Sequence, residues 1–165
     1  AQRFTHAADF AARMVLQNAL FFGRKRLSAL HIPWCLYTQP ELAHVGLTAG
    51  MAATKKIPID TFTVPLDGVD RAILDEATGG FARVHVRKGS DAIVGATFVG
   101  PHAGESLQAI VLAMNNNLGL GKLASAICPY PTQADALRKI GDLYNRTRLT
   151  PRAARILKTL LALNR

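Results

Sequence analysis

The sequence is poor in cysteine, and its two cysteines carry little structural information. Cys35 and Cys128 lie far apart in the 165 residues and form no CxxC pair. This spacing argues against a disulfide framework and against a cysteine-based metal centre. Free cysteines are typical of a reducing compartment, so we expect a cytoplasmic protein.

Long apolar runs are also missing. A transmembrane helix needs roughly 20 consecutive apolar residues, and no stretch of this sequence approaches that length. The first residues lack the basic segment, the apolar core and the small-residue cleavage site of a signal peptide. With 49% hydrophobic and 19% charged residues, the chain is expected to be soluble and to bury one core of ordinary size, with or without an appendage.

Acidic residues are scarce relative to basic ones. The chain has 11 Asp and Glu against 20 Lys and Arg, which gives a formal net charge of +9. The excess is concentrated in residues 127–165, which hold eight basic and two acidic residues. Basic clusters bind nucleic acid or anionic membranes in some proteins, but no zinc motif, RNP-like sequence or aromatic-interleaved basic strand accompanies this one. We therefore expect no nucleic-acid partner, and a basic binding module without catalysis remains the alternative function.

The segment 127–148 passes from a proline-flanked tyrosine, Tyr130, into an amphipathic helix pattern. Proline fixes its own φ and disfavours helical backbone in the residue before it, so we expect the Tyr130 ring to project from a stiff, extended backbone. Thr132 occupies the expected N-cap of a helix over 131–145, with Asp135 three residues later in an approximate capping box. One interpretation is purely structural, in which the cap holds the helix and the tyrosine packs.

Hydrophobic periodicity predicts the remaining helices and strands. The expected helices are residues 5–22 with Thr5 as N-cap, 48–55 with Thr48 as N-cap, 105–118 ended by Gly119, and a last helix from Pro151 onward. The expected strands are 34–38, 44–47, 57–66, 81–87 and 92–99, the last two joined as an antiparallel hairpin. This order implies an α+β fold, with an antiparallel sheet of four to five strands and helices on one face.

Two features leave alternatives open. His85 is interpreted as a residue of a strand face rather than a metal ligand, because no second ligand stands at a suitable spacing. The helix over 151–165 opposes leucines to Arg and Lys. Packing against a core or another subunit is the more common use of such a helix, and contact with a membrane surface is the alternative.

Three motifs together resemble the pyridine nucleotide-disulfide oxidoreductases, the flavoenzymes that include glutathione reductase, dihydrolipoamide dehydrogenase and mercuric reductase. The opening of their interface domain is matched at Pro33, Thr38, Pro40, Glu41, Ala43, Val45 and Gly46. Residues 100–105 resemble their Gly-x-x-Ala-x-Glu turn. Residues 130–135, Tyr-Pro-Thr-Gln-Ala-Asp, resemble their His-Pro-Thr-x-x-Glu element, and a tyrosine in place of the histidine is similar to mercuric reductase.

The resemblance implies a dimerisation domain and roles for three residues. In the family the His-Glu pair is an acid/base in the active site of the partner subunit, and the tyrosine of mercuric reductase helps to hold the metal ion. Tyr130 is therefore expected to reach the redox disulfide of the partner subunit in a homodimer. Asp135 stands in the place of the glutamate. Cys128 is either an added soft ligand or a plain packing cysteine.

The first helix is also explained by the resemblance. Phe4-Thr5-His6-Ala7 is similar to the start of the last helix of the family's flavin domain, whose positive end faces the flavin ring. Thr5, His6 and Ala7 are therefore the expected cofactor contacts. Residues 1–26 are interpreted as the terminal helix of a flavin domain, 31–148 as the dimerisation domain and 149–165 as a basic C-terminal helix.

The same family implies FAD and NAD(P)H in the full-length enzyme. The glycine-rich dinucleotide loops and the CxxxxC pair that this chemistry needs do not occur in the 165 residues, so we expect neither cofactor nor activity in the isolated chain. Asp135 is one methylene shorter than glutamate, and the sequence ends in LLALNR where mercuric reductases carry a vicinal cysteine pair. The substrate therefore stays open between mercuric ion and another disulfide or metal substrate. A small Cys/His hydrolase is a rival class, but no nucleophile motif surrounds Cys128.

Overall fold

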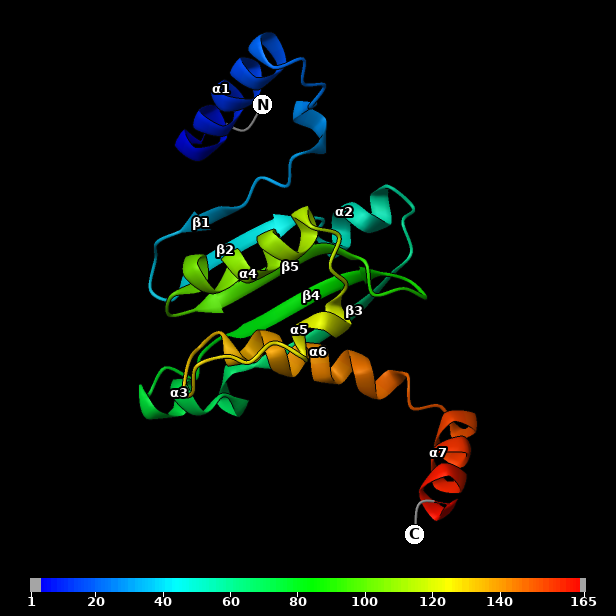
Figure 1. The fold of residues 1–165 in the computed structure, drawn as a ribbon. Coiled ribbons are helices and arrows are strands. Elements are labelled where there is room, and N and C mark those ends of the chain that lie inside the picture. Colours follow the sequence, from blue (N-terminus) through cyan, green and yellow to red (C-terminus); the bar gives the residue numbers. More distant parts are fainter. Residues whose placement is uncertain (1–3, 164–165) are drawn as a thin grey trace.

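A five-stranded antiparallel sheet forms the centre of the chain (Figure 1). The computed structural model describes residues 4–163, so residues 1–3 and 164–165 of the predicted terminal regions lie outside the described residues. The strands are β1 (Trp34–Leu36), β2 (Glu41–Gly46), β3 (Ile59–Pro65), β4 (Phe81–Arg87) and β5 (Ile93–Gly100). Their order in the sheet is β1-β2-β5-β4-β3.

The pairing of the strands explains where they begin and end. The predicted hairpin is confirmed, because β4 pairs with β5 from Phe81 opposite Val99 to Val86 opposite Ile93. The predicted strand 44–47 was too short, since β2 already begins at Glu41. It pairs with β5 along its whole length, with Glu41 opposite Gly100 at the far end.

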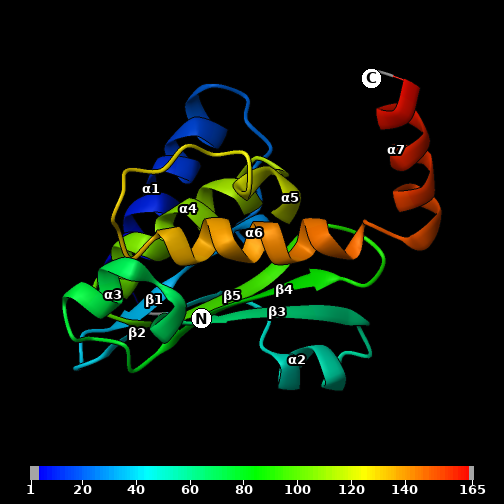
Figure 2. The ribbon, with the colours of Figure 1, turned by 90° about the horizontal axis from the view of Figure 1, so that it is seen from below.

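The helices are α1 (Thr5–Leu20), α2 (Ala49–Thr54), α3 (Asp70–Leu74), α4 (Ala103–Asn115), α5 (Leu120–Leu123), α6 (Asp135–Thr147) and α7 (Pro151–Leu163), with short 3₁₀ turns η1 (Leu27–Ala29) and η2 (Leu66–Gly68). As predicted, helices cover one face of the sheet, and α4 and α6 form this layer. The long helix α4 lies on β2 and β5, and α6 lies on β3 and β4 (Figure 2). The expected α+β class is therefore confirmed.

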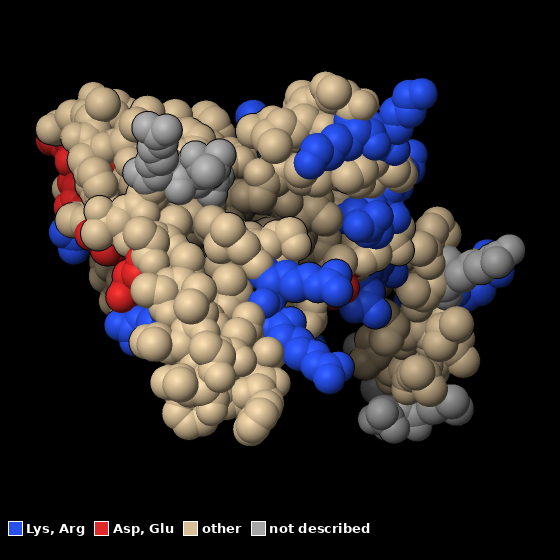
Figure 3. Space-filling view, turned by 90° about the horizontal axis from the view of Figure 1, so that it is seen from above, with Lys and Arg blue, Asp and Glu red and all other residues tan. Residues whose placement is uncertain are grey.

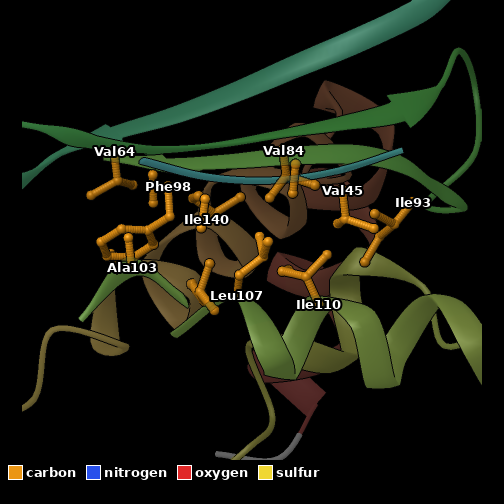
Figure 4. Packing of buried hydrophobic residues seen from close by; sticks show 14 of the residues in the cluster. Val45, Val64, Val84, Ile93, Phe98, Ala103, Leu107, Ile110 and Ile140 are labelled. Carbon is orange, nitrogen blue, oxygen red and sulfur yellow. The ribbon is translucent and has the colours of Figure 1, made fainter. Parts of the chain in front are cut away.

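The core lies between the sheet and these two helices. The sheet contributes buried apolar side chains at alternate positions, among them Val45, Val84 and Phe98. Leu107 and Ile110 of α4 and Ile140 of α6 complete the layer, and these helix residues are no more than 2% exposed (Figure 4). Burying a large aliphatic side chain stabilises a fold by about 1.5–3 kcal/mol, so this layer fixes both helices on the sheet.

The other face of the sheet carries two buried histidines. His44 donates from Nε2 to the carbonyl oxygen of Gly46 at 3.1 Å, and its Nδ1 lies 2.9 Å from Oγ1 of Thr97. His85 Nδ1 lies 2.8 Å from Oγ1 of Thr61 on the neighbouring strand. The interpretation of His85 as a strand-face residue is confirmed. Burial lowers the pKa of both imidazoles, which favours the neutral rings in the folded sheet.

The ends of three helices differ from the prediction. Helix α4 ends at Asn115 because Asn117 adopts a left-handed conformation (φ 53°). The amide of Leu118 then bonds to the carbonyl of Ala113, which is the arrangement of a Schellman cap. The predicted stop at Gly119 was therefore wrong. Helix α1 starts from Phe4 as N-cap, without a side-chain cap, so the predicted Thr5 cap was also wrong.

Thr48 was predicted correctly as the N-cap of α2, since its Oγ1 accepts from the amide of Met51. The third difference, at the start of α6, belongs to the candidate site below. Helix α1 and helix α7 project beyond the two ends of the sheet (Figure 1). Within residues 4–163, no helix combines the length and the apolar character needed to cross a membrane.

Charge is unevenly distributed over the surface. Seen from above, acidic side chains lie mainly along one edge together with a few basic ones, whereas most basic side chains lie over the centre and the opposite side (Figure 3). On α7, the exposed side chains of Ile156, Leu157, Leu160 and Leu161 lie among basic residues. Membrane contact through 151–165 stays a prediction.

Candidate functional site

The loop before α6 carries Tyr130 and is closed by short-range hydrogen bonds. Thr132 donates from Oγ1 to the carbonyl oxygen of Pro129 at 3.0 Å, and the amide of Asp135 bonds to the carbonyl of Thr132. This tight turn of the i→i+3 type delays the helix. Helix α6 begins at Asp135, and its N-cap, Ala134, makes no side-chain cap bond. The predicted Thr132 cap and helix start at 131 were therefore wrong.

Asp135 is engaged inside its own helix. Its Oδ1 accepts from Nε of Arg138 at 2.7 Å, and Lys139 Nζ lies 3.7 Å from its Oδ2. Side chains three or four residues apart lie on the same helix face, so these contacts are local. The hydrogen bond with Asp135 raises the pKa of Arg138. The predicted capping box is not formed, because basic side chains occupy the carboxylate.

Tyr130 has a different carboxylate as its partner. Its hydroxyl donates to Oδ2 of Asp70, sixty residues earlier, at 2.8 Å. Among residues 4–163 the structure records no hydrogen bond between Tyr130 and Asp135. The hydrogen bond with Asp70, followed by its negative charge, raises the pKa of the phenol. The ring is 74% exposed, so Tyr130 projects outward while its hydroxyl is held.

The α3 segment that supplies Asp70 is fixed to the core and to α6. Val69 and Ala72, on either side of Asp70, are fully buried. Lys139 of α6 donates from Nζ to the carbonyl oxygen of Gly68 at 2.7 Å. The contact between α6 and η2, which are distant in sequence, thereby keeps Asp70 close to Tyr130.

A second link joins the same two segments. Asp75 Oδ2 accepts from Nε of Arg71 at 2.7 Å and from Nε2 of Gln133 at 3.4 Å. The hydrogen bond from Arg71 lowers the pKa of the Asp75 carboxyl. Gln133 is 5% exposed, and its Oε1 has no hydrogen-bond partner among the described residues. These residues line a shallow cavity of about 340 Å³ together with His102, Glu105 and Ser106.

Cys128 lies in the same loop and is half-buried. Its Sγ lies 3.9 Å from the carbonyl oxygen of Ala126, and it is close enough to Arg138 to influence that guanidinium electrostatically. Within residues 4–163, no three His, Cys, Asp or Glu side chains are grouped so that they could hold a metal ion.

The predicted cofactor contacts lie at the start of α1. Thr5 and His6 are exposed and Ala7 is buried. His6 Nε2 lies 2.7 Å from the carbonyl oxygen of Pro33, which ties α1 to the segment before β1. His6 and Ala7 also line a cavity of about 600 Å³ together with Trp34, Cys35 and Gln108.

The sequence reasoning missed Asp70. Residues 67–80 hold four acidic residues, and no motif marks any one of them as functional. Only the fold brings Asp70 to Tyr130, because η2 and α3 follow β3 at the same end of the sheet as the loop before α6. In the sequence, Asp70 is marked only by its acidic side chain and by its position between two predicted strands.

The sheet order, the helices on one face and the loop before α6 agree with the dimerisation domain that the sequence resembles. Residues 32–140 match the family described as "Pyridine nucleotide-disulphide oxidoreductase, dimerisation domain". The chain belongs to this family.

Its curated relatives include mercuric reductases. It is 32% identical over 144 residues to mercuric reductase from Acidithiobacillus ferrooxidans, covering 87% of this chain and 26% of that protein. It is 30% identical over 136 residues to the enzyme from Staphylococcus aureus, covering 82% of this chain and 25% of that protein. The chain thus spans about a quarter of the relatives that it matches.

Solved structures share the fold. LpdA from Mycobacterium tuberculosis superposes with a TM-score of 0.79 at 23% identity, covering 87% of this chain and 31% of that one. The flavoprotein disulfide reductase RclA from Escherichia coli gives a TM-score of 0.78 at 22% identity, with coverages of 87% and 33%.

Proposed function

We propose that this chain is the interface region of an FAD-dependent NAD(P)H:disulfide oxidoreductase similar to mercuric reductase, and that Tyr130 serves the active site of the partner subunit. The observation that carries the proposal is the state of Tyr130. Its hydroxyl is anchored to Asp70 while 74% of the side chain is exposed. Tyrosine is typical of interfaces, where one end of the ring is apolar and the other is polar.

The partner is a second copy of the chain. Large apolar side chains that are half or more exposed include Leu36 of β1, Tyr37 just after it, Leu112 of α4 and Ile127 in the tyrosine loop. Protein interfaces cover exposed apolar side chains, and two-fold symmetry is the commonest arrangement of a homo-oligomer. The match to a dimerisation domain supports the same assembly.

The start of α1 suits a flavin. Within residues 4–163, no side chain caps this helix and its first turn holds no acidic residue, so the positive end of the helix favours negative charge. Thr5, His6 and Ala7 would hold the ring there through this end of the helix. FAD, reduced by NAD(P)H, supplies the electrons that reach a redox disulfide. Residues 1–26 then belong to a flavin domain, 31–148 to the dimerisation domain and 149–165 to a C-terminal extension.

The residues of this chain have distinct parts in the reaction. The raised pKa of Tyr130 keeps the phenol protonated at neutral pH, so it binds and orients the substrate or donates a proton, and it does not act as a general base. Asp135, paired with Arg138, maintains the helix that follows the loop. Cys128 offers a soft sulfur ligand in the same loop. The substrate is mercuric ion or another metal or disulfide compound.

Mixed dimers of the full-length enzyme test whether Tyr130 acts across the interface. One subunit carries Tyr130→Phe, and the other lacks one cysteine of the redox disulfide. If the tyrosine serves the partner, one site of each mixed dimer has both an intact disulfide and an intact tyrosine. We expect the purified mixed dimers to reach about half of the wild-type turnover, because one site in two is complete.

Two controls define this experiment. The homodimer of each variant gives the baseline, and the purified mixed dimer of wild type with the cysteine variant gives the value for one working site. Mixed dimers that stay at the Tyr130→Phe baseline would place the tyrosine in its own subunit's site or outside catalysis.

A further inference from the structure

We propose that Asp70 is the positioning residue of Tyr130, and that it replaces the carboxylate at position 135 as the partner of the active-site side chain. The inference rests on the proposed function, because it assigns how the tyrosine of that site is held. It concerns a residue that lies outside the tyrosine loop and the helix after it.

The geometry separates the two candidate carboxylates. Asp70 Oδ2 accepts from the Tyr130 hydroxyl at 2.8 Å, a normal distance for a strong O–H···O bond. Asp135 is 13% exposed in its side chain and accepts from Arg138 at 2.7 Å. A carboxylate that is held by a guanidinium on its own helix is poorly placed to serve the loop as well. Asp70 has no ion-pair partner within 4.0 Å among the described residues.

The fold gives Asp70 a fixed place. It is the first residue of α3, and its neighbour Val69 is fully buried. The backbone just before it is held by Lys139, which donates to the carbonyl of Gly68 at 2.7 Å. The two residues just before Asp70 therefore attach it to the core, through Val69, and to α6, through Gly68. A side chain on such a support limits the movement of the Tyr130 hydroxyl.

This pairing determines how the phenol is presented. The O–H of Tyr130 points at Asp70, so the lone pairs of its oxygen are directed elsewhere. An oxygen whose proton is donated to a carboxylate is a better acceptor and a better ligand. Tyr130 thus offers an oxygen ligand to the substrate, and Asp70 is the nearest base for the phenolic proton. Asp70 and Asp135 are the two acids whose charges act on this phenol.

Titration of the 165-residue chain tests the pairing without any catalysis. The absorbance of tyrosinate is followed against pH in the wild type and in Tyr130→Phe, and the difference isolates Tyr130. The same difference is measured in an Asp70→Asn background, which keeps the shape of the side chain and removes its charge. We expect Tyr130 to ionise at lower pH in this background. Asp67→Asn is the matched control, because Asp67 is an exposed acid three residues earlier that makes no hydrogen bond to Tyr130 among the described residues.

Half-reactions of the full-length flavoenzyme test the role in turnover. Asp70→Asn should slow the transfer from the redox disulfide to the substrate on the order of tenfold, the effect of weakening one charge-assisted hydrogen bond. Flavin reduction by NAD(P)H should be unchanged, and Asp67→Asn should behave as wild type in both steps. Asp70→Glu should recover part of the rate.

The outcomes separate the inference from the proposed function. If Tyr130→Phe slows the substrate step but Asp70→Asn does not, Asp70 is not the positioning residue and the proposed function stands. An unchanged ionisation of Tyr130 in Asp70→Asn also overturns the inference. If Tyr130→Phe leaves the rate of the substrate step unchanged, the proposed role of Tyr130 is wrong. The proposed role of Asp70 in turnover is then wrong as well.

Discussion

Gly141 of α6 lies directly against the backbone of Ala124, where a Cβ atom on residue 141 would stand 2.6 Å from the Ala124 amide nitrogen. The chain before the tyrosine loop and the helix after it therefore meet without any side chain between them. Gly141→Ala should force the two segments apart and destabilise the fold by about 1–3 kcal/mol, the usual cost of overpacking. Urea unfolding followed by circular dichroism measures this change.

The matched control for this change is Gly50→Ala in α2, where an added Cβ meets nothing nearer than 4.0 Å. Alanine favours a helix over glycine, so this variant should be neutral or slightly more stable. If both variants unfold at the same urea concentration, the close packing of α6 on the segment at Ala124 does not matter for stability.

Ile140 tests the core layer beneath the site. It is fully buried between α6 and the sheet (Figure 4). Ile140→Ala removes three buried carbon atoms and leaves a cavity, so unfolding should become easier by about 2–5 kcal/mol. Ile156 of α7, which is 62% exposed, supplies the control, and Ile156→Ala should change stability by less than about 0.5 kcal/mol. Equal effects of the two substitutions would show that α6 is not held by this layer.

The buried histidines predict a loss of stability in weak acid. His44 and His85 have lowered pKa values because of burial, and the charge of Arg83 lowers that of His85 further. The unfolded chain therefore binds more protons than the folded chain as pH falls through the ordinary histidine pKa, near 6.5. Stability should be full above that pH and should decrease below it.

Urea midpoints at pH 7.5 and pH 5.5 measure this effect, since unperturbed carboxyl groups titrate mostly below that range. His44→Asn, which removes the ionisable ring at a position bonded to Thr97, should reduce the difference between the two midpoints. A wild-type midpoint that is the same at both pH values would contradict the inferred neutrality of the two rings.

Self-association is the simplest expected property of the isolated chain. The exposed apolar side chains on β1, α4 and the tyrosine loop should drive formation of a two-fold dimer. Sedimentation velocity at concentrations on the order of tens of micromolar should detect it, because association follows mass action. Tyr37→Asp, at an 80% exposed position, should shift the equilibrium toward monomer. A strict monomer at those concentrations would count against the interface.

Much of the fold was predictable from local pattern. The alternation in residues 81–87 and 92–99 gave the hairpin, and the apolar spacing of α4 and α6 gave the helices that cover the sheet. Helix ends were less predictable. Asn117 rather than Gly119 takes the left-handed position, because a Schellman cap is selected by the tertiary position of the chain as well as by the residue type.

The site was predictable only where residues are close in sequence. Tyr130 and Asp135 were found through their motif. The motif did not reveal that Asp135 pairs with Arg138 within the helix and not with Tyr130. The partner of Tyr130 is sixty residues away. A contact of that kind depends on how β3, η2 and α3 return to the loop, and periodicity along one segment contains no information about it.

We expect Tyr130 to act on the substrate and not on the flavin. Rapid-mixing measurements on the full-length enzyme separate the two half-reactions in wild type and in Tyr130→Phe. In Tyr130→Phe, the rate of flavin reduction by NAD(P)H should be unchanged. The rate of transfer from the redox disulfide to a metal or disulfide substrate should decrease on the order of tenfold to a hundredfold. Equal losses in both half-reactions, or no loss in either, would contradict it and would leave Tyr130 with a structural role only.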